Sequence, residues 1–181
     1  GSEQDRRLVI TMLGKIEVRP AVGAGASGRV QPRGARQKSL LGTMVANELV
    51  GGRLKRDEFL EAAGIEVDHN DPKLARDAVN SAIYRLRDIV GQDGILTDRA
   101  TPRLNLAVLR VDLIEAAAFL REAADAMQQG RPARARDAAI RALDLTRGEV
   151  PFPTLYEGLF EELRDDLELR LRSVVLRAGA L

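Results

Sequence analysis

The stretch Asp71–Gly91 reads DPKLARDAVNSAIYRLRDIVG, and it predicts the best-defined helix of the chain. Asp71 is a favoured N-cap residue, Pro72 suits the first helical position, and Gly91 is a common helix stop. Apolar residues recur along the stretch at the spacing of one helical face. They are Leu74, Ala78, Val79, Ala82, Ile83, Leu86 and Val90. We therefore predict a helix over about 72–90 that packs through this stripe.

The opposite side of this helix carries side chains that can bind nucleic acid. It presents Lys73, Arg76, Asn80, Tyr84 and Arg87 at spacings of three and four residues. Arginine can bind a guanine edge with two hydrogen bonds, and asparagine can bind an adenine edge in the same way. The pattern favours a helix that reads bases in DNA. The alternative is a solvated helix face, with Tyr84 partly in the core and with negative charge from Asp77 and Asp88.

Strands and two shorter helices are predicted before the long helix. The predicted elements are strands over 8–13, 15–19 and 29–31 and helices over 35–50 and 55–63. β-Branched runs on both sides of Gly14 indicate the first strand pair. Apolar residues at helical spacing, followed by Gly51-Gly52 and by Gly64, indicate the two helices and their ends.

A glycine-rich segment, Gly23–Gly28 (GAGASG), has the letters of a dinucleotide-binding fingerprint. Such a site requires the glycines to open a helix whose N-terminus holds the pyrophosphate. Here Pro20 precedes the glycines and Arg29–Gly34 follows them, a run that includes Pro32 and cannot form the first turn of a helix. We interpret the segment as a flexible connection between strands and predict no nucleotide cofactor.

After the long helix the pattern changes to a hairpin and then to further helices. Short strands are predicted over 94–97 and 103–106, joined by the polar turn 98–102. Helices are predicted over 113–129, 133–145 and 156–177. Their spacing resembles helical-hairpin repeats. The boundary between the two kinds of sequence falls near Arg110-Val111-Asp112.

This order of elements predicts a winged helix-turn-helix over 6–110, followed by an α-helical TPR-like domain over 111–181. The fold class is mainly α with a small β-sheet. In a winged helix the third helix, here 72–90, enters the major groove, and the wing, here about 95–106, reaches the DNA backbone. Residues 29–56 hold seven basic residues and one acidic residue. The predicted backbone contacts are Arg36, Lys38, Arg53, Lys55, Arg56, Arg99 and Arg103.

The composition argues against several other classes of protein. The 181 residues include no cysteine, which excludes disulfides and thiolate metal sites and suits a reducing, cytoplasmic location. No apolar run approaches the roughly 20 residues that span a bilayer, so we expect no membrane partner. His69 lacks companion ligands for a metal, and the carboxylates at 161–162 and 165–166 suit a solvated helix face. We predict no catalytic residue, no metal, no cofactor and no enzyme activity.

Several short motifs carry a family resemblance. They are Leu13–Val18 (LGKIEV), Arg36–Leu41 (RQKSLL), Tyr84–Gly91 (YRLRDIVG), Val111-Asp112 and Ala142–Gly148 (ALDLTRG). Through them the chain resembles the SARP family of bacterial transcriptional activators. The resemblance implies an OmpR-like winged helix followed by a bacterial transcriptional activation domain of TPR-like helices. That second domain is short here, and Gly1-Ser2 looks like an expression scar, so we expect a truncated piece of a longer protein.

The sequence therefore favours a DNA-binding transcriptional regulator whose partner is double-stranded DNA. The resemblance implies contacts of the helical half with RNA polymerase or with a second copy in a homodimer. The alternative is a winged-helix and TPR-like module for protein contacts that has lost DNA binding. A formal net charge of +1 and the acids Asp77 and Asp88 favour that alternative.

Overall fold

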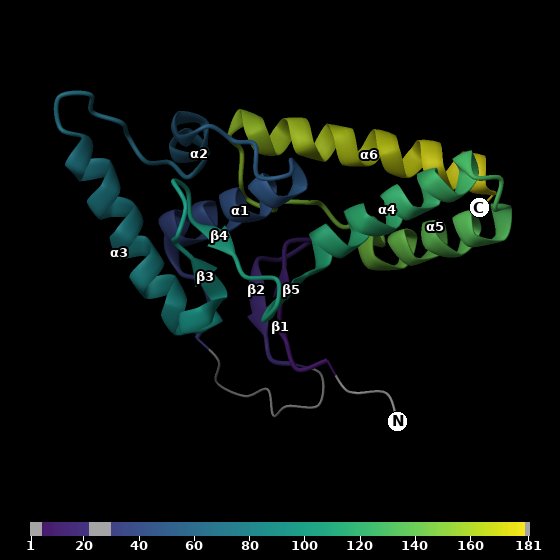
Figure 1. The fold of residues 1–181 in the computed structure, drawn as a ribbon, viewed down its shortest axis with the longest axis horizontal. Helices are drawn as coiled ribbons and strands as arrows, with labels where there is room; N and C mark the ends of the chain where they lie inside the picture. The colour runs from purple at the N-terminus through teal and green to yellow at the C-terminus, as the bar shows by residue number, and fades with distance from the viewer. Residues whose placement is uncertain (1–4, 22–29, 180–181) are drawn as a thin grey trace.

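The fold is mainly helical in the computed structural model, which describes residues 5–21 and 30–179. Within those residues, six α-helices follow one another along the chain (Figure 1). They are α1 (Gly34–Leu49), α2 (Arg56–Ala62), α3 (Pro72–Val90), α4 (Asp112–Gln128), α5 (Pro132–Thr146) and α6 (Gly158–Ala178). The predicted helices are confirmed, with shifts of one or two residues at some ends. The predicted class, mainly α with a small sheet, is confirmed as well.

A three-stranded sheet joins the start of the chain to the segment before α4. Strand β1 (Leu8–Thr11) lies in the middle, antiparallel to β2 (Glu17–Arg19) and parallel to β5 (Leu109–Val111). The predicted pair of β1 and β2 is confirmed. Strand β5 was not predicted, because so short a run has no clear periodicity and its partner strand lies far back in the sequence.

The predicted strand over 29–31 is wrong for its described residues, Val30 and Gln31, which lie outside any strand. The side-chain amide of Gln31 instead bonds the edge of β2. Its Nε2 donates to the Val18 carbonyl and its Oε1 accepts from the Val18 N–H, both at 2.8 Å. A side-chain amide offers the same donor and acceptor as a peptide group, so one residue substitutes for a strand. The segment Gly23–Gly28 lies outside the described residues.

The predicted hairpin after α3 is confirmed. A 3₁₀ turn, η1 (Gln92–Gly94), leads into β3 (Ile95–Leu96), which pairs antiparallel with β4 (Arg103–Leu104). The strands are shorter than predicted. Ile95 and Leu104 face each other and are buried, so the hairpin is anchored in the core at its base, and residues 97–100 of the connecting loop are exposed.

Helix α3 packs through a face that differs from the predicted stripe. Its buried residues are Ala75, Val79, Ala82, Ile83, Leu86, Ile89 and Val90. Leu74 is 59% exposed, so its assignment to the stripe was wrong. Residues that repeat every four positions drift by about 40° per step around a helix of 3.6 residues per turn. Leu74, the first residue of the predicted stripe, therefore points away from the core, whereas Ala82, Leu86 and Val90 are buried in it.

Aromatic residues after α5 attach the C-terminal helices to α1. Phe152 and Phe160 are buried, with ring centroids 5.0 Å apart. A Cβ atom placed on Gly42 of α1 would collide with Leu155 and touch the ring of Phe160. One apolar cluster thus runs from β1 through α1 to α6 and crosses residue 110, which lies inside β5. The division into domains 6–110 and 111–181 stays a prediction.

The start of α4 is bound to the end of β1 by Asp112. Its Oδ1 accepts hydrogen bonds from the backbone N–H of Met12 and of Leu113, each at 2.7 Å, and its Oδ2 accepts from that of Leu13 at 3.3 Å. Burial raises the pKa of Asp112 to about 6, although these three donors act to lower it. The Val111-Asp112 motif is therefore a structural junction between the sheet and the helical half.

Helix α3 stands at one end of the long axis of the molecule, and α4 and α5 lie toward the other (Figure 1). The outer face of α3 is therefore turned away from the C-terminal helices. Across the described residues, no helix is both long and apolar enough to cross a membrane.

Candidate nucleic-acid interface

A small cavity lies between α2, α3 and the hairpin loop 97–102. Its volume is about 100 Å³, and among the described residues three arginines line it. Arg56 comes from the first turn of α2, Arg76 from α3 and Arg99 from the hairpin loop. We call this site the arginine cavity. None of the described residues that line it is acidic, so the arrangement can bind an anion.

One hydrogen bond holds the arginine cavity together. The Arg56 guanidinium donates to the Ala100 carbonyl at 2.9 Å, and this joins the start of α2 to the hairpin loop, 44 residues later. The Arg56 side chain remains exposed. A guanidinium has five N–H donors, so Arg56 keeps donors free to bind an incoming phosphate.

The arginine cavity has an apolar floor and a polar rim. Phe59, Val79 and Ile83 contribute the floor. The rim includes the predicted residue Asn80 together with Thr97 and Thr101, which sequence reasoning missed. Thr101 belongs to the segment 98–102 predicted as a polar, cation-bearing turn, and Thr97 was predicted as the end of the strand before it. The residue types could have suggested them, but their distance from α3 in the sequence hid the proximity.

The exposed face of α3 carries most of the predicted base-reading residues. Lys73, Arg76 and Asn80 are exposed, and Tyr84 is 75% exposed. A partly buried Tyr84, the alternative from the sequence, is therefore wrong. Asp77 and Asp88 are exposed on the same helix. The face is mixed in charge, with the arginine cavity along one side of it.

Arg87 points inward to the hairpin. It is half-buried, and its guanidinium donates to the Ile95 carbonyl of β3 at 3.0 Å. Its Nε atom is buried and has no hydrogen-bond partner within the described residues. Arg87 therefore holds the base of the hairpin against α3, and its guanidinium is committed to this contact.

Arg103 is also bound to another residue of the chain. It forms two hydrogen bonds to Glu48 at the end of α1, Nε to Oε1 at 2.9 Å and Nη2 to Oε2 at 3.1 Å. The side chains of Arg103 and Glu48 are 34% and 12% exposed. The Arg103 charge is therefore neutralised where the hairpin meets α1.

The other predicted backbone contacts lie apart from the arginine cavity or beside it. Arg53 donates to the Val50 carbonyl at 2.7 Å and caps the end of α1, and Lys55 is exposed one residue before α2. Arg36 and Lys38 lie near the start of α1, about 15–18 Å along the helix from Glu48 at its far end. The structure brings Arg56, Arg76, Asn80 and Arg99 together around the arginine cavity, and Arg36 and Lys38 are not among its described lining residues.

No protein-family model matches the chain, and no curated protein matches it. Within the described ranges, no group of three or more His, Cys, Asp or Glu side chains is placed to hold a metal ion. The site is therefore interpreted from its own geometry.

Proposed function

We propose that the chain is a DNA-binding transcriptional regulator, in which residues 6–110 act as a winged helix-turn-helix. The observation that carries the proposal is the arginine cavity, where cations from three separate elements converge and none of the described lining residues is acidic. A phosphate of the DNA backbone has the charge and the acceptor oxygens that such a site binds.

The proposed docking places α3 in the major groove and the hairpin loop on the adjacent backbone. Asn80 and Tyr84 then face base edges, Arg76 lies between the bases and the nearest phosphate, and Arg56 and Arg99 bind phosphate. Arg87 and Arg103 contribute indirectly, because they hold the hairpin at its angle to α3 and α1. The helical half, 111–181, is proposed as a TPR-like domain for contacts with RNA polymerase or in a homodimer, in the cytoplasm.

A salt titration of duplex binding tests the proposal. The duplex is first selected from a random pool, and its affinity is then measured at increasing salt. Each phosphate contact contributes about −0.9 to the slope of log affinity against log salt concentration. We expect Arg99→Ala to weaken all duplexes alike and to reduce the slope by about one contact. Arg136, exposed on α5, supplies the matched control Arg136→Ala, which should change neither quantity.

Base reading is tested separately from phosphate binding. We expect Arg76→Ala or Asn80→Ala to relax the base preference at one or two positions, at a cost of about 1–3 kcal/mol per lost base contact. An unaltered preference in both variants would remove α3 from base recognition, whatever the salt slope.

A protein-interaction module without DNA binding is the second candidate. The exposed acids Asp77 and Asp88 on α3 favour it, because they would repel phosphates near the proposed reading face. Failure of every duplex to bind above background at low salt would refute the first candidate and favour this one.

A further inference from the structure

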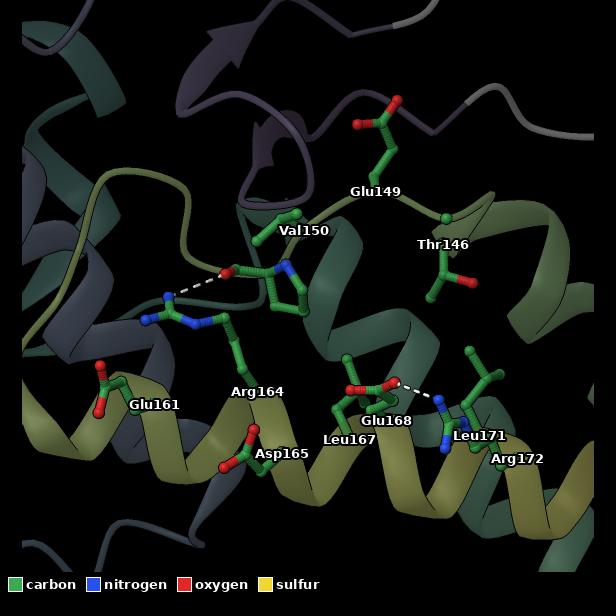
Figure 2. Close-up of a pocket in the computed structure, with 12 residues that line it drawn as sticks. Thr146, Glu149, Val150, Glu161, Arg164, Asp165, Leu167, Glu168, Leu171 and Arg172 are labelled. Carbon is green, nitrogen blue, oxygen red and sulfur yellow. Dashed lines mark hydrogen bonds and ion pairs between the residues drawn. The ribbon is translucent and has the colours of Figure 1, made fainter.

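A second, larger cavity forms a groove between α6 and the segment 146–151, which begins at the last residue of α5 (Figure 2). Its volume is about 680 Å³, and no residue lines both it and the arginine cavity. Val150, Leu167 and Leu171 give it an apolar lining, and Val150 is 55% exposed. Within the described ranges its acidic lining residues are Glu149, Glu161, Asp165 and Glu168. We call it the acid-rimmed groove.

The two arginines that line the acid-rimmed groove, Arg164 and Arg172, already have hydrogen-bond partners within the chain. The Arg164 guanidinium donates to the carbonyls of Pro151 and Phe152 at 3.2 and 2.9 Å, which holds the segment 146–151 over α6 (Figure 2). Arg172 pairs with Glu168 at 2.7 Å.

The remaining carboxylates of the groove have no such partner. No hydrogen bond or ion pair joins the side chain of Glu149, Glu161 or Asp165 to another residue of the described part of the chain. Glu161 and Asp165 thus stand on α6 beside the apolar lining with their acceptor capacity unused, whereas the Glu149 side chain points away from α6 (Figure 2). Among the described lining residues four acids stand against Arg164 and Arg172, so two negative charges are not offset.

The spacing of the carboxylates on α6 indicates the shape of an occupant. Glu161 and Asp165 are four residues apart and Glu168 follows three residues later, so all lie along one side of the helix over about 10 Å. A second helix with arginines or lysines at the same spacing can match this row. Its apolar residues can then contact Leu167 and Leu171, and the aliphatic stems of its basic side chains can cover Val150.

We propose that the acid-rimmed groove binds a basic amphipathic helix of a partner protein. Charge complementarity carries the choice of occupant: the carboxylates attract arginine and lysine, and they repel nucleic acid phosphates. The volume lies in the range of cavities that bury most of a bound ligand, about 300–1,000 Å³. This surface is distinct from the arginine cavity, and the proposal does not depend on DNA binding.

The test uses the whole chain and a fluorescein-labelled peptide of Leu, Ala and Arg, about 14 residues long so that it can form a helix when bound. Its arginines follow a spacing of three and four residues beside a leucine stripe. Binding is measured by fluorescence anisotropy. We expect the double variant Glu161→Gln with Asp165→Asn to weaken binding about tenfold, from the loss of two ion pairs. The same variant should bind DNA as the parent chain does.

The matched control is Glu162→Gln with Asp166→Asn, one residue further along α6 and outside the groove lining. It removes the same charge and should change peptide affinity by less than about twofold. Equal weakening by both double variants would overturn the proposal, because net charge would then explain binding.

Three other outcomes would overturn the proposal. They are failure of the peptide to bind, equal binding of a peptide with serine in place of leucine, and self-association of the chain that the groove variants abolish. The last result, seen by sedimentation, would assign the groove to a second copy. Circular dichroism of each variant verifies that these exposed substitutions leave the helices intact.

Discussion

Replacing Asp112 with asparagine should remove a pH dependence of stability that is built into the junction of β1 and α4. The carboxylate accepts the N–H groups of Met12, Leu13 and Leu113 in a partly buried position. Asparagine keeps one oxygen for the two shorter bonds. Its amide nitrogen replaces the oxygen that accepts from Leu13, so the longer bond is lost and two donors face each other.

The direction and the size of this pH dependence of stability follow from the shifted pKa of Asp112. Burial raises the pKa of Asp112 from 3.8 to about 6, so the folded protein disfavours the ionised carboxylate relative to the unfolded chain. The stabilisation from the protonated group is fully present below pH 3.8 and is lost as the pH rises through about 6. The whole pKa shift corresponds to roughly 3 kcal/mol in the free energy of unfolding. This is an upper value, because the carboxyl group is only partly buried and solvent screens part of the effect.

Urea unfolding at about pH 4 and about pH 7.5 measures how the free energy of unfolding depends on pH. The parent chain should exceed the Asp112→Asn variant in stability at the lower pH, and this difference should shrink by about 2–3 kcal/mol at the higher pH. Asp5, whose pKa is lowered by Arg7, occurs in both proteins, so its titration cancels in the comparison. Asp125→Asn, exposed on α4, controls for the loss of a carboxylate. Parallel pH curves for the parent and Asp112→Asn would refute the reasoning.

Two further predictions concern packing and the hairpin. Gly42→Ala places a methyl group against Leu155 and Phe160. In urea melts this change should lower the free energy of unfolding by about 1–3 kcal/mol. Unchanged stability would contradict the packing of the C-terminal segment on α1. A double-mutant cycle of Glu48→Gln and Arg103→Met should give a coupling of about 1 kcal/mol, with no change in the salt slope of DNA binding. A coupling near zero would contradict a stabilising ion pair between Glu48 and Arg103, and a reduced salt slope would assign Arg103 to the DNA backbone after all.

The helices were predictable because their signals are local. Asp71 and Pro72 begin α3, Gly91 ends it, and hydrophobic periodicity indicated the rest. Strand β5 was missed for the opposite reason, since three residues become a strand through pairing with β1. The face of α3 was predicted in part, because a stripe repeating every four residues drifts around the helix and carried Leu74 away from the core.

The candidate site shows the same division between local and distant signals. The sequence indicated Arg76 and Asn80 on α3 and Arg99 in the hairpin loop, because residue type and helical spacing are local properties. It could not indicate that Arg56 would bond the same loop, since that contact depends on how α2 meets the hairpin.

By itself, the sequence determined the type and order of the helices, the hairpin after α3 and the surplus of basic residues in the first part of the chain. Only the tertiary structure decided which cations remain free. Arg103 and Arg76 are equally basic in the sequence, yet the first meets Glu48 and the second opens onto the arginine cavity. The physical reason is that a charge is neutralised by whatever lies within a few ångströms of it, and that neighbour is set by packing between distant segments.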